Sequence, residues 1–338
     1  MSLSLAFIRD AAGLEALRPE WDQLFAEATN VNAYLSYGWS RVQWDRWALR
    51  HPRALYICTL RDGERLVLIA PFVRVSRALR PTRIEGLTTV LPQTEDMLIR
   101  DGTDATVATE FLLKGIARAN PLALLRLKRL AGSSPIHAAM TRRHVSMQSV
   151  GTVGADVKDG FDAYFATVSG AIRSKHRRML KRLEGLGRVS FTLDDPARRY
   201  TDIQWMLRLK REQWWAEGTR PRRWLISPSA QSDFLQLTHT KIAPAGAVLG
   251  TLRVGDTTIA AMLAFTGGTN ASIYVATYDP AYADYSPGRT AILLMIEKLA
   301  TLGITRVDFM AGSSELKLRL GDPGPPIYSL QLPLYRLL

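Results

Sequence analysis

The chain lacks several features that identify common protein classes. Its 338 residues include one cysteine, so a single chain can form neither a disulfide framework nor a cysteine-rich zinc site. That residue, Cys58, lies in an apolar strand-like run, and we expect a buried, inert thiol. No uninterrupted apolar stretch approaches the ~18 residues of a membrane-spanning helix, which predicts a soluble cytoplasmic protein. Peripheral contact with a membrane stays open.

The motifs of several enzyme classes are also missing. The sequence contains no Walker loop, no Gly-x-Ser-x-Gly elbow and no Gly-x-Gly-x-x-Gly after a predicted strand. Its histidines show no metal-ligand spacing: His51, His137, His144, His176 and His239. We therefore set aside NTPase, serine hydrolase and dinucleotide oxidoreductase functions, and we expect no metal.

Acidic residues are outnumbered by basic ones. There are 44 Lys and Arg residues against 31 Asp and Glu, a net charge of +13. Such a field attracts anions without choosing among them. Nucleic acid, acidic glycan, anionic lipid, a phosphorylated cofactor or sugar nucleotide, and a merely solubilising surface all stay open.

The chain is 47% hydrophobic and long enough for two ordinary domains. In the first half, periodicity predicts helices over 14–28, 37–49 and 105–119, and strands over 55–60, 65–75, 84–90, 96–100 and 122–130. The pair Asp62-Gly63 predicts a hairpin. We interpret 150–155, which has two glycines and little periodicity, as a linker.

The second half shows a similar order of elements. We predict helices over 161–167, 172–186, 195–217 and 288–302, and strands over 246–254, 257–265, 271–278 and 305–310. Gly255-Asp256 turns the hairpin, and Gly303 ends the last helix. The repeated order suggests a tandem duplication of α/β (α+β) class, with an N-terminal domain 1–152 and a C-terminal domain 153–338.

The tripeptide Ser286-Pro287-Gly288 stands between a predicted strand and a predicted helix. Ser286 suits the N-cap, Pro287 suits the first helical position, and Gly288 leaves the backbone N–H groups of the first turn unshielded. An anionic group such as a pyrophosphate would fit there. A plain helix cap after a loop is the alternative.

Several motifs occur in a characteristic order along the chain. They are Trp39 and Trp44, an Arg-rich helix from Arg173 that ends in Leu183-Glu184-Gly185-Leu186-Gly187, Trp214-Trp215 with Gly218, Asp279-Pro280, Ser286-Pro287-Gly288, Asp308 with Gly312, and Leu316-Lys317. In this order the chain resembles the GNAT superfamily of acyl-CoA transferases, and more closely its CelD-like or BioF-like acetyltransferase group, relatives of the Fem transferases. The chain departs from the pattern at Val307, where an aromatic residue is frequent, and at Leu316, where Tyr is usual.

The resemblance implies two GNAT-like domains, the first degenerate, each with a mixed, mostly antiparallel sheet flanked by helices. In the second domain the sheet would splay between the neighbouring parallel strands 271–278 and 305–310 and admit acetyl-CoA or a longer acyl-CoA as co-substrate. Its pyrophosphate would lie at Ser286, Pro287, Gly288 and Arg289, and Tyr274 and Val275 would line its arm.

Acyl transfer to an amine needs a base, polarisation of the thioester carbonyl and a proton for the thiolate. Asp308 is the candidate base, with turn capping as the alternative. Lys317 is the candidate for holding a substrate anion or developing charge, with a solvated lysine as the alternative. Tyr278 or Tyr285 could protonate the thiolate, although aromatic packing also accounts for them.

Two further groups are candidate substrate contacts. Seven Lys and Arg residues lie between Arg173 and Arg188, and Arg173 and Arg177, one turn apart, could clamp phosphates of a nucleotide-linked or lipid-linked sugar or of tRNA. A solvated helix face is the alternative. Trp214 and Trp215 are adjacent on a predicted helix and cannot both face the core equally, so one could floor a substrate cleft between the two domains, with core packing as the alternative.

The sequence therefore predicts an N-acyltransferase that moves an acetyl or longer acyl group from acyl-CoA to an amine. The acceptor could be a small molecule or an amino sugar of a cell-surface polysaccharide precursor. A Fem-like transferase that takes its acyl group from aminoacyl-tRNA is one alternative. A non-catalytic module that binds a nucleotide or polymer is another.

Overall fold

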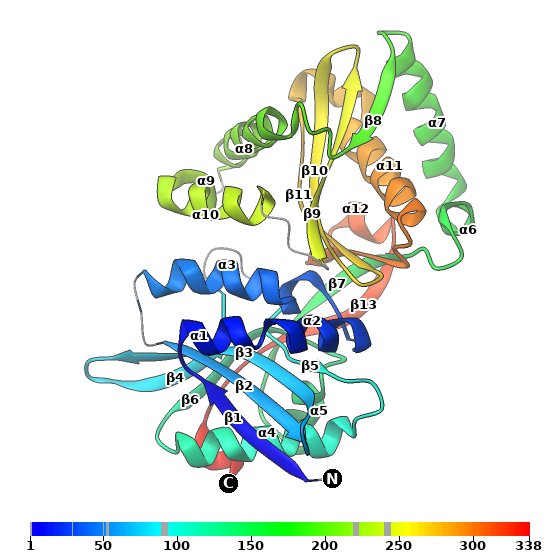
Figure 1. Cartoon of the computed structure of the whole chain (residues 1–338). Helices are drawn as coiled ribbons and strands as arrows, with labels where there is room; N and C mark the ends of the chain where they lie inside the picture. Colours follow the sequence, from blue (N-terminus) through cyan, green and yellow to red (C-terminus); the bar gives the residue numbers. More distant parts are fainter. Residues whose placement is uncertain are drawn as a thin grey trace. The chain divides into compact units, whose positions relative to one another are not determined.

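The computed structural model describes residues 2–28, 30–49, 51, 54–88, 94–218, 223–239 and 245–338 (Figure 1). The chain divides into two compact units. Unit 1 is formed mainly by Met1–Gly151 and Pro325–Leu338, and unit 2 by Thr152–Thr240 and Gly246–Gly324. Each unit contains its own set of neighbouring strands and helices.

The sheet of unit 1 is mostly antiparallel. Its strands are arranged in the order β1 (Leu3–Ile8), β2 (Leu55–Asp62), β3 (Arg65–Arg77), β4 (Arg80–Gly86), β6 (Leu124–Ala131) and β13 (Asp322–Pro333), with β5 (Leu98–Ile99) paired to β3. The recorded pairs are antiparallel except β4 with β6, which are parallel. A parallel pair needs a crossover connection, and α4 lies in it.

Helices α4 and α5 bury their apolar sides in the core of unit 1. The helical segments of this unit are α1 (Ala11–Ala16), α2 (Arg18–Glu27), η1 (Ala33–Leu35), α3 (Tyr37–Ala48), α4 (Ala105–Ala119), α5 (Pro135–Arg142) and η3 (Leu334–Leu337). Leu112 and Ile116 of α4 and Leu125 of β6 are fully buried in one apolar cluster. Cys58 lies in the same cluster, as predicted, and burial raises the pKa of its thiol.

The strands of unit 2 are arranged much like those of unit 1, with one parallel pair among antiparallel neighbours. Its strands run β7 (Gln148–Asp156), β12 (Arg306–Ala311), β11 (Asn270–Tyr278), β10 (Thr257–Gly267), β9 (Ala245–Val254) and β8 (Val189–Leu193). β11 and β12 are parallel, whereas β7 with β12, β10 with β11 and β8 with β9 are antiparallel. The crossover between β11 and β12 contains α11.

Helices cover both faces of the unit 2 sheet. They are α6 (Phe161–Thr167), α7 (Gly170–Glu184), α8 (Arg199–Ala216), α9 (Arg223–Ile226), α10 (Pro228–His239), η2 (Pro280–Tyr285), α11 (Pro287–Thr301) and α12 (Glu315–Leu318). Helix α8 lies on one face, and α7 and α11 lie on the other (Figure 1). Buried side chains of α11, such as Leu293 and Ile296, pack with Met262 of β10 and Leu183 of α7 in one core.

Most predicted elements are present, and the mixed, mostly antiparallel fold class is confirmed in both units. The predicted linker 150–155 is wrong, because these residues form much of β7. Gly154 serves close backbone approach: a Cβ there would lie 2.9 Å from the carbonyl oxygen of Val307. A Cβ on Gly321 would likewise lie 2.4 Å from the carbonyl oxygen of Gly154.

Other boundaries differ from the prediction. The helix predicted over 14–28 is two helices, α1 and α2, because Pro19 favours a new helix start. The strand predicted over 84–90 begins earlier, at Arg80, and positions 89–90 lie outside the described residues. The last segment, Pro325–Leu338, belongs to unit 1 by its contacts, although the predicted limit assigned it to the second domain. β8, α5, α10 and β13 were not predicted.

The described residues lack two features that would bear on function. No helix in them is long and apolar enough to cross a bilayer. Within the same residues, no group of three or more His, Cys, Asp or Glu side chains is arranged to hold a metal ion.

Candidate functional site

The parallel strands β11 and β12 separate after three residue pairs. The pairs are Asn270–Arg306, Ala271–Val307 and Ser272–Asp308, and no later residues of these two fully described strands pair with each other. On its other side β12 has an irregularity between Asp308 and Ala311, where Met310 has a φ of 64°. The sheet therefore opens toward the carboxyl ends of β11 and β12.

Helix α11 begins beside the end of β11. A Cβ on Gly288 would lie 3.0 Å from Cδ1 of Tyr278, so only glycine leaves this approach undisturbed. Ser286 stands at the N-cap position in the left-handed conformation (φ 49°, ψ 49°), and its hydroxyl caps no backbone N–H. The predicted capping role of Ser286 is therefore wrong. With Pro287 at the first position, the N–H groups of Gly288 and Arg289 keep no side-chain cap, which leaves them for an anion.

Arg289 adds positive charge at this helix start. Its Nε and Nη2 atoms are buried and have no hydrogen-bond partner among the described residues. Burial lowers the pKa of the guanidinium, and the neighbouring charge of Arg319 lowers it further. Buried polar atoms are normally satisfied. An anionic oxygen at the α11 start would satisfy these two, so the residues present fit the pyrophosphate of an acyl-CoA.

Helix α7 brings a second set of polar atoms to the same region. His176 is buried, its Nδ1 has no partner among the described residues, and its pKa is lowered to about 4 by burial and by the charges of Arg289 and Arg177. Arg173, also on α7, has a buried Nε without a partner in the described chain. His176 was not predicted, although its place between Ile172 and Met179 on the inward side of the helix was a usable signal.

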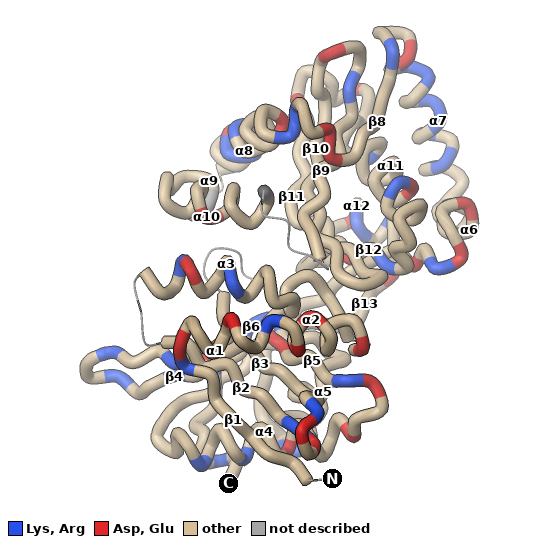
Figure 2. Tube along the Cα trace, in the orientation of Figure 1, with Lys and Arg blue, Asp and Glu red and all other residues tan. Residues whose placement is uncertain are grey.

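The end of α7 contacts the segment that precedes α11. The guanidinium of Arg182 lies 4.7 Å from the ring centroid of Tyr285, and its Nη1 donates to the carbonyl oxygen of Asp284 (3.2 Å). Arg177 is exposed and lies over the ring of Phe165 at 5.9 Å. Basic residues recur along α7 (Figure 2). Leu186 is 50% exposed because α7 ends at Glu184.

Asp308 and Lys317 lie together at the opening of the sheet. Oδ1 of Asp308 accepts the N–H of Met310 at 2.7 Å, and burial raises the pKa of this carboxyl. Lys317 Nζ donates to three carbonyl oxygens, those of Met310 (3.1 Å), Ala311 (2.8 Å) and Gly312 (3.2 Å). Burial lowers the pKa of Lys317, while Asp308 opposes that shift. The ammonium thereby holds the irregular end of β12 in place.

The remaining predicted residues, Tyr274, Val275 and Tyr278, lie on β11. Val275 is buried and pairs with Leu263 of β10. The ring of Tyr274 packs edge-on against Phe265 at 5.7 Å and near Phe234 at 6.5 Å. Tyr278 is 39% exposed at the end of the strand, beside Gly288.

Two of the three tryptophans of α8, Trp214 and Trp215, are candidate substrate contacts, and they differ in exposure. Trp215 is 59% exposed, so it does not pack in the core. Trp214 is half-buried, and Nζ of Lys210 lies 5.8 Å from its ring centroid. The same Nζ donates to the carbonyl oxygen of Ala276 on β11 at 3.1 Å. Lys210, which was not predicted, therefore ties α8 to the strand that borders the opening.

The predicted residues thus form two groups in unit 2. Arg289 at the α11 start lies with His176 and Arg177 of α7, as their mutual charge effects show. Asp308 lies with Lys317 at the end of β12. Trp215 belongs to neither group, because it is exposed on the last turn of α8.

Comparisons with known proteins agree with this geometry. A family model described as an acetyltransferase (GNAT) domain matches residues 170–318. A search of curated proteins found no significant match. The structure of FemX is similar, with a TM-score of 0.66, 13% identity and coverage of 99% of each chain.

Two further solved structures are similar in fold. A conserved protein of unknown function from Bacteroides thetaiotaomicron has a TM-score of 0.53 and 14% identity, with 97% of this chain and 99% of that chain covered. A tandem GNAT protein from the clavulanic acid biosynthesis pathway has a TM-score of 0.52 and 12% identity, with 98% and 99% covered. At these identities the likeness shows the fold, which is a tandem GNAT fold.

Proposed function

We propose that the protein is an N-acyltransferase that moves an acetyl or longer acyl group from acyl-CoA to an amine, because the model of a GNAT acetyltransferase domain matches residues 170–318. The observation that carries this proposal is the opening between β11 and β12 next to an uncapped helix start. An elongated thioester with an anionic end matches that combination.

The donor would be held by two elements of unit 2. The N–H groups of Gly288 and Arg289 and the unpaired guanidinium of Arg289 would bind the pyrophosphate. Arg173 and His176 supply further donors from α7. Backbone groups of β11 near Tyr274 and Val275 would border the arm. When bound, acyl-CoA supplies the acyl group as an activated thioester.

The amine would be deprotonated by Asp308. Its pKa is raised by burial, which makes the carboxylate a stronger base than an exposed Asp. Lys317, through its three carbonyl contacts, would keep Asp308 and the end of β12 in position. Tyr278 beside Gly288, or Tyr285 beside Arg182, would donate a proton to the departing thiolate.

Calorimetric titration of the purified protein with acetyl-CoA and longer acyl-CoAs tests the donor. We expect binding of one molecule per chain, weakened in Arg289→Ala and unchanged in Lys298→Ala, which removes an exposed charge at the far end of α11. Absence of binding to every acyl-CoA would contradict the proposal.

The titration of His176 is an independent readout of the same site. An anion bound beside Arg289 would offset the charges that disfavour the imidazolium, so the pKa of about 4 should rise when CoA is added. NMR of the histidine ring signals between pH 3 and pH 7 measures the pKa of His176 with and without CoA. An unchanged pKa at saturating CoA would place the anion elsewhere.

A Fem-like transferase that takes its acyl group from aminoacyl-tRNA is the second candidate. The exposed basic side of α7, including Arg177 and Arg178, favours it, as does the net charge of +13. Retention of aminoacyl-tRNA with a steep salt dependence, together with no binding of acyl-CoA, would select this candidate. A polysaccharide precursor as acceptor stays part of the proposal.

A further inference from the structure

The outer side of α4 in unit 1 combines apolar and basic side chains. At about 100° per residue, four exposed residues fall within about 60° of one another around the helix axis: Val107, Phe111, Lys114 and Arg118. Val107 and Phe111 are 45% and 39% exposed, whereas Ile116, on the opposite side of the helix, is fully buried in the core. The outer side of α4 therefore keeps apolar groups that the core of unit 1 does not cover.

The exposed apolar side chains continue beyond the helix. Leu122, which follows the end of α4 at Ala119, is 88% exposed. The N–H of Leu334 donates to the carbonyl oxygen of Ala123 at 2.9 Å, so η3 lies beside this turn, and Tyr335 of η3 is 61% exposed. In Figure 1, α4 lies next to the C-terminal end of the chain. Together with four residues of the helix, Leu122 forms what we call the α4 surface: Val107, Phe111, Lys114, Arg118 and Leu122.

A hollow lies between α4 and β1, at the middle of the α4 surface. Its volume is about 600 Å³, and it is lined by Leu5, Phe111, Lys114, Gly115, Arg118 and Ala119. Strand β1 packs directly on the helix backbone here, because a Cβ on Gly115 would collide with Cδ2 of Leu5. Most of the lining is apolar, and the two cations belong to the same lining. The α4 surface is therefore an apolar hollow bordered by two positive charges.

The two cations are not neutralised by the chain. Within the described residues, neither Lys114 nor Arg118 has an ion pair or a hydrogen bond. They stand four residues apart on one helix, where Cβ atoms are about 5–6 Å from each other, so their charges repel. The carboxylates on or just before α4 are engaged elsewhere: Glu110 pairs with Arg143, and Asp104 caps the first turn. An external anion is complementary to this pair of charges.

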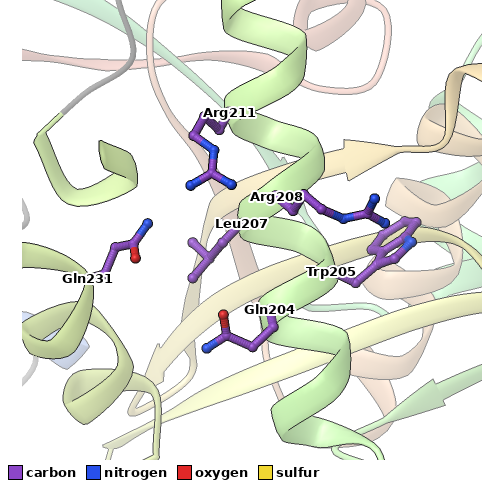
Figure 3. Close-up of a pocket in the computed structure, with 6 residues that line it drawn as sticks. All are labelled: Gln204, Trp205, Leu207, Arg208, Arg211 and Gln231. Carbon is purple, nitrogen blue, oxygen red and sulfur yellow. The ribbon is translucent and has the colours of Figure 1, made fainter. Parts of the chain in front are cut away.

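A pocket of unit 2 lacks this combination (Figure 3). It lies between α8 and α10 and is lined by Gln204, Trp205, Leu207, Arg208, Arg211 and Gln231. Its two arginines extend to different sides of α8 (Figure 3). Adjacent cations at the border of an apolar hollow are thus found at α4 and not at this pocket.

We propose that the α4 surface docks on the surface of a lipid bilayer that contains anionic lipids. The outer side of a helix is convex, and a bilayer supplies both an apolar layer and phosphates to a convex surface without a matching groove. An acidic protein partner would need such a groove to cover Phe111 and Leu122 as well as the cations. Because no described helix is long and apolar enough to cross a bilayer, the contact is made at the membrane surface. The proposal concerns unit 1 and is independent of the proposed function.

Sedimentation of the full chain with lipid vesicles tests the docking. We expect at least about 10-fold tighter binding to phosphatidylcholine vesicles with about one third phosphatidylglycerol than to phosphatidylcholine alone. Binding should weaken about 5-fold in Lys114→Ala and in Arg118→Ala, and added salt should weaken it further. Leu122→Ser, a change at an exposed position, should weaken it about 10-fold.

The end of α11 in unit 2 offers a matched control. Lys298 and Leu302 are exposed and have the same four-residue spacing as Arg118 and Leu122. Lys298→Ala and Leu302→Ser should therefore bind the anionic vesicles as the parent does. Equal losses at both helix ends would contradict docking through α4.

A fluorescent label locates the contact. Because Cys58 is buried, Leu122→Cys supplies an exposed thiol for an environment-sensitive fluorophore, and Leu302→Cys supplies the control. The emission of the label at position 122 should shift to shorter wavelength with anionic vesicles, and that at 302 should not. Binding through the basic side of α7 would leave the label at 122 unshifted and would contradict the proposal.

Three further results would overturn the proposal and leave the proposed function standing, because no step of these tests uses acyl-CoA. They are no binding to anionic vesicles, equal binding to both kinds of vesicle, and retention of the protein by immobilised poly-glutamate without binding to anionic vesicles. The last result would assign the α4 surface to an acidic protein partner instead.

Discussion

Within the residues that the structure describes, a parallel strand pair occurs in unit 1 and another in unit 2, and the two pairs differ in what lies beyond them. In unit 1, β4 and β6 pair from Arg83–Leu124 to Glu85–Arg126. Beyond these pairs, the side chain of Glu95 bridges the two strands. It packs on Gly86 of β4, accepts a hydrogen bond from the hydroxyl of Thr88 (3.1 Å), and accepts another from the N–H of Lys128 of β6 (2.7 Å). Among the described residues of unit 2, no side chain forms a comparable bridge between β11 and β12.

The helix that follows differs in the same way. The first turn of α4 is capped by Asp104, whose Oδ1 accepts the N–H groups of Thr106 (2.9 Å) and Val107 (3.0 Å). The first turn of α11 has no side-chain cap and carries Arg289. Unit 1 therefore supplies its own carboxylates at both places where unit 2 leaves room for an anionic ligand. Under the proposed function, the same fold serves as a scaffold in unit 1 and as the donor site in unit 2.

The largest expected effect comes from removing Asp308, the proposed base of unit 2. Asp308→Asn keeps the size of the side chain and removes its proton-accepting carboxylate, so kcat should fall about 10²–10⁴-fold with little change in acyl-CoA affinity. Arg126 occupies the equivalent third pair in unit 1. Arg126→Ala should leave kcat within a few-fold of the parent. Equal losses in both variants would remove the functional distinction between the units.

The Glu95 bridge of unit 1 should make the free energy of unfolding depend on pH. Burial raises the pKa of Glu95 to about 7, above the ordinary value of 4.5, so the folded state retains a proton that the unfolded state has lost between these values. The free energy of unfolding should therefore fall as pH rises from about 4.5 to 7 and level off above. Glu95→Gln should remove up to about 3 kcal/mol of this fall.

Denaturant unfolding at pH 5 and pH 9 measures this difference. Some pH dependence should survive in Glu95→Gln, because burial also raises the pKa of Asp96 to about 7. Glu64→Gln, an exposed change in the β2–β3 turn, is the control and should follow the parent. An identical pH profile in Glu95→Gln and the parent would mean that the bridge carries no buried carboxyl.

The proposed anion site of unit 2 should depend on Arg289. Removing a guanidinium that donates to a phosphate costs about 1.5–3 kcal/mol, so Arg289→Ala should weaken acyl-CoA binding about 10- to 100-fold. The dependence of affinity on salt should also become shallower. An unchanged dissociation constant would show that the α11 start is an ordinary helix start like that of α4.

The smallest expected effect contrasts the two helix starts directly. Asp104→Ala removes the cap of α4 and should lower the free energy of unfolding by about 1 kcal/mol. Ser286→Ala removes a hydroxyl that makes no cap, so its effect on stability should stay within about 0.5 kcal/mol. Thermal unfolding of both variants checks this. A larger loss for Ser286→Ala would reverse the contrast.

Local patterns predicted most of the elements, because hairpin turns and helix periodicity are encoded within a few residues. Helix α4 and the strand pair around Gly63 were found with nearly correct limits. The linker prediction over 150–155 failed at Gly154, because a glycine needed for close contact between distant strands looks the same in sequence as a glycine in a linker. β13 was missed because its pairing with β6 joins segments about two hundred residues apart.

The site was predictable only where a motif marks it. Ser286-Pro287-Gly288 located the α11 start, but its uncapped conformation depends on the preceding turn, which a motif does not encode. His176 and Lys210 depend on which side of a helix faces a neighbouring element. Arg208 and Arg211 form a pocket only because α10 lies opposite, and α10 itself was not predicted.

The most direct test of the contrast between the units is a crystal structure of the protein with CoA. The account predicts one CoA per chain, with its pyrophosphate at the N–H groups of Gly288 and Arg289 and its arm in the opening beyond the Ser272–Asp308 pair. CoA bound beside α4 and Glu95 in unit 1, or bound in unit 2 away from the α11 start, would contradict it.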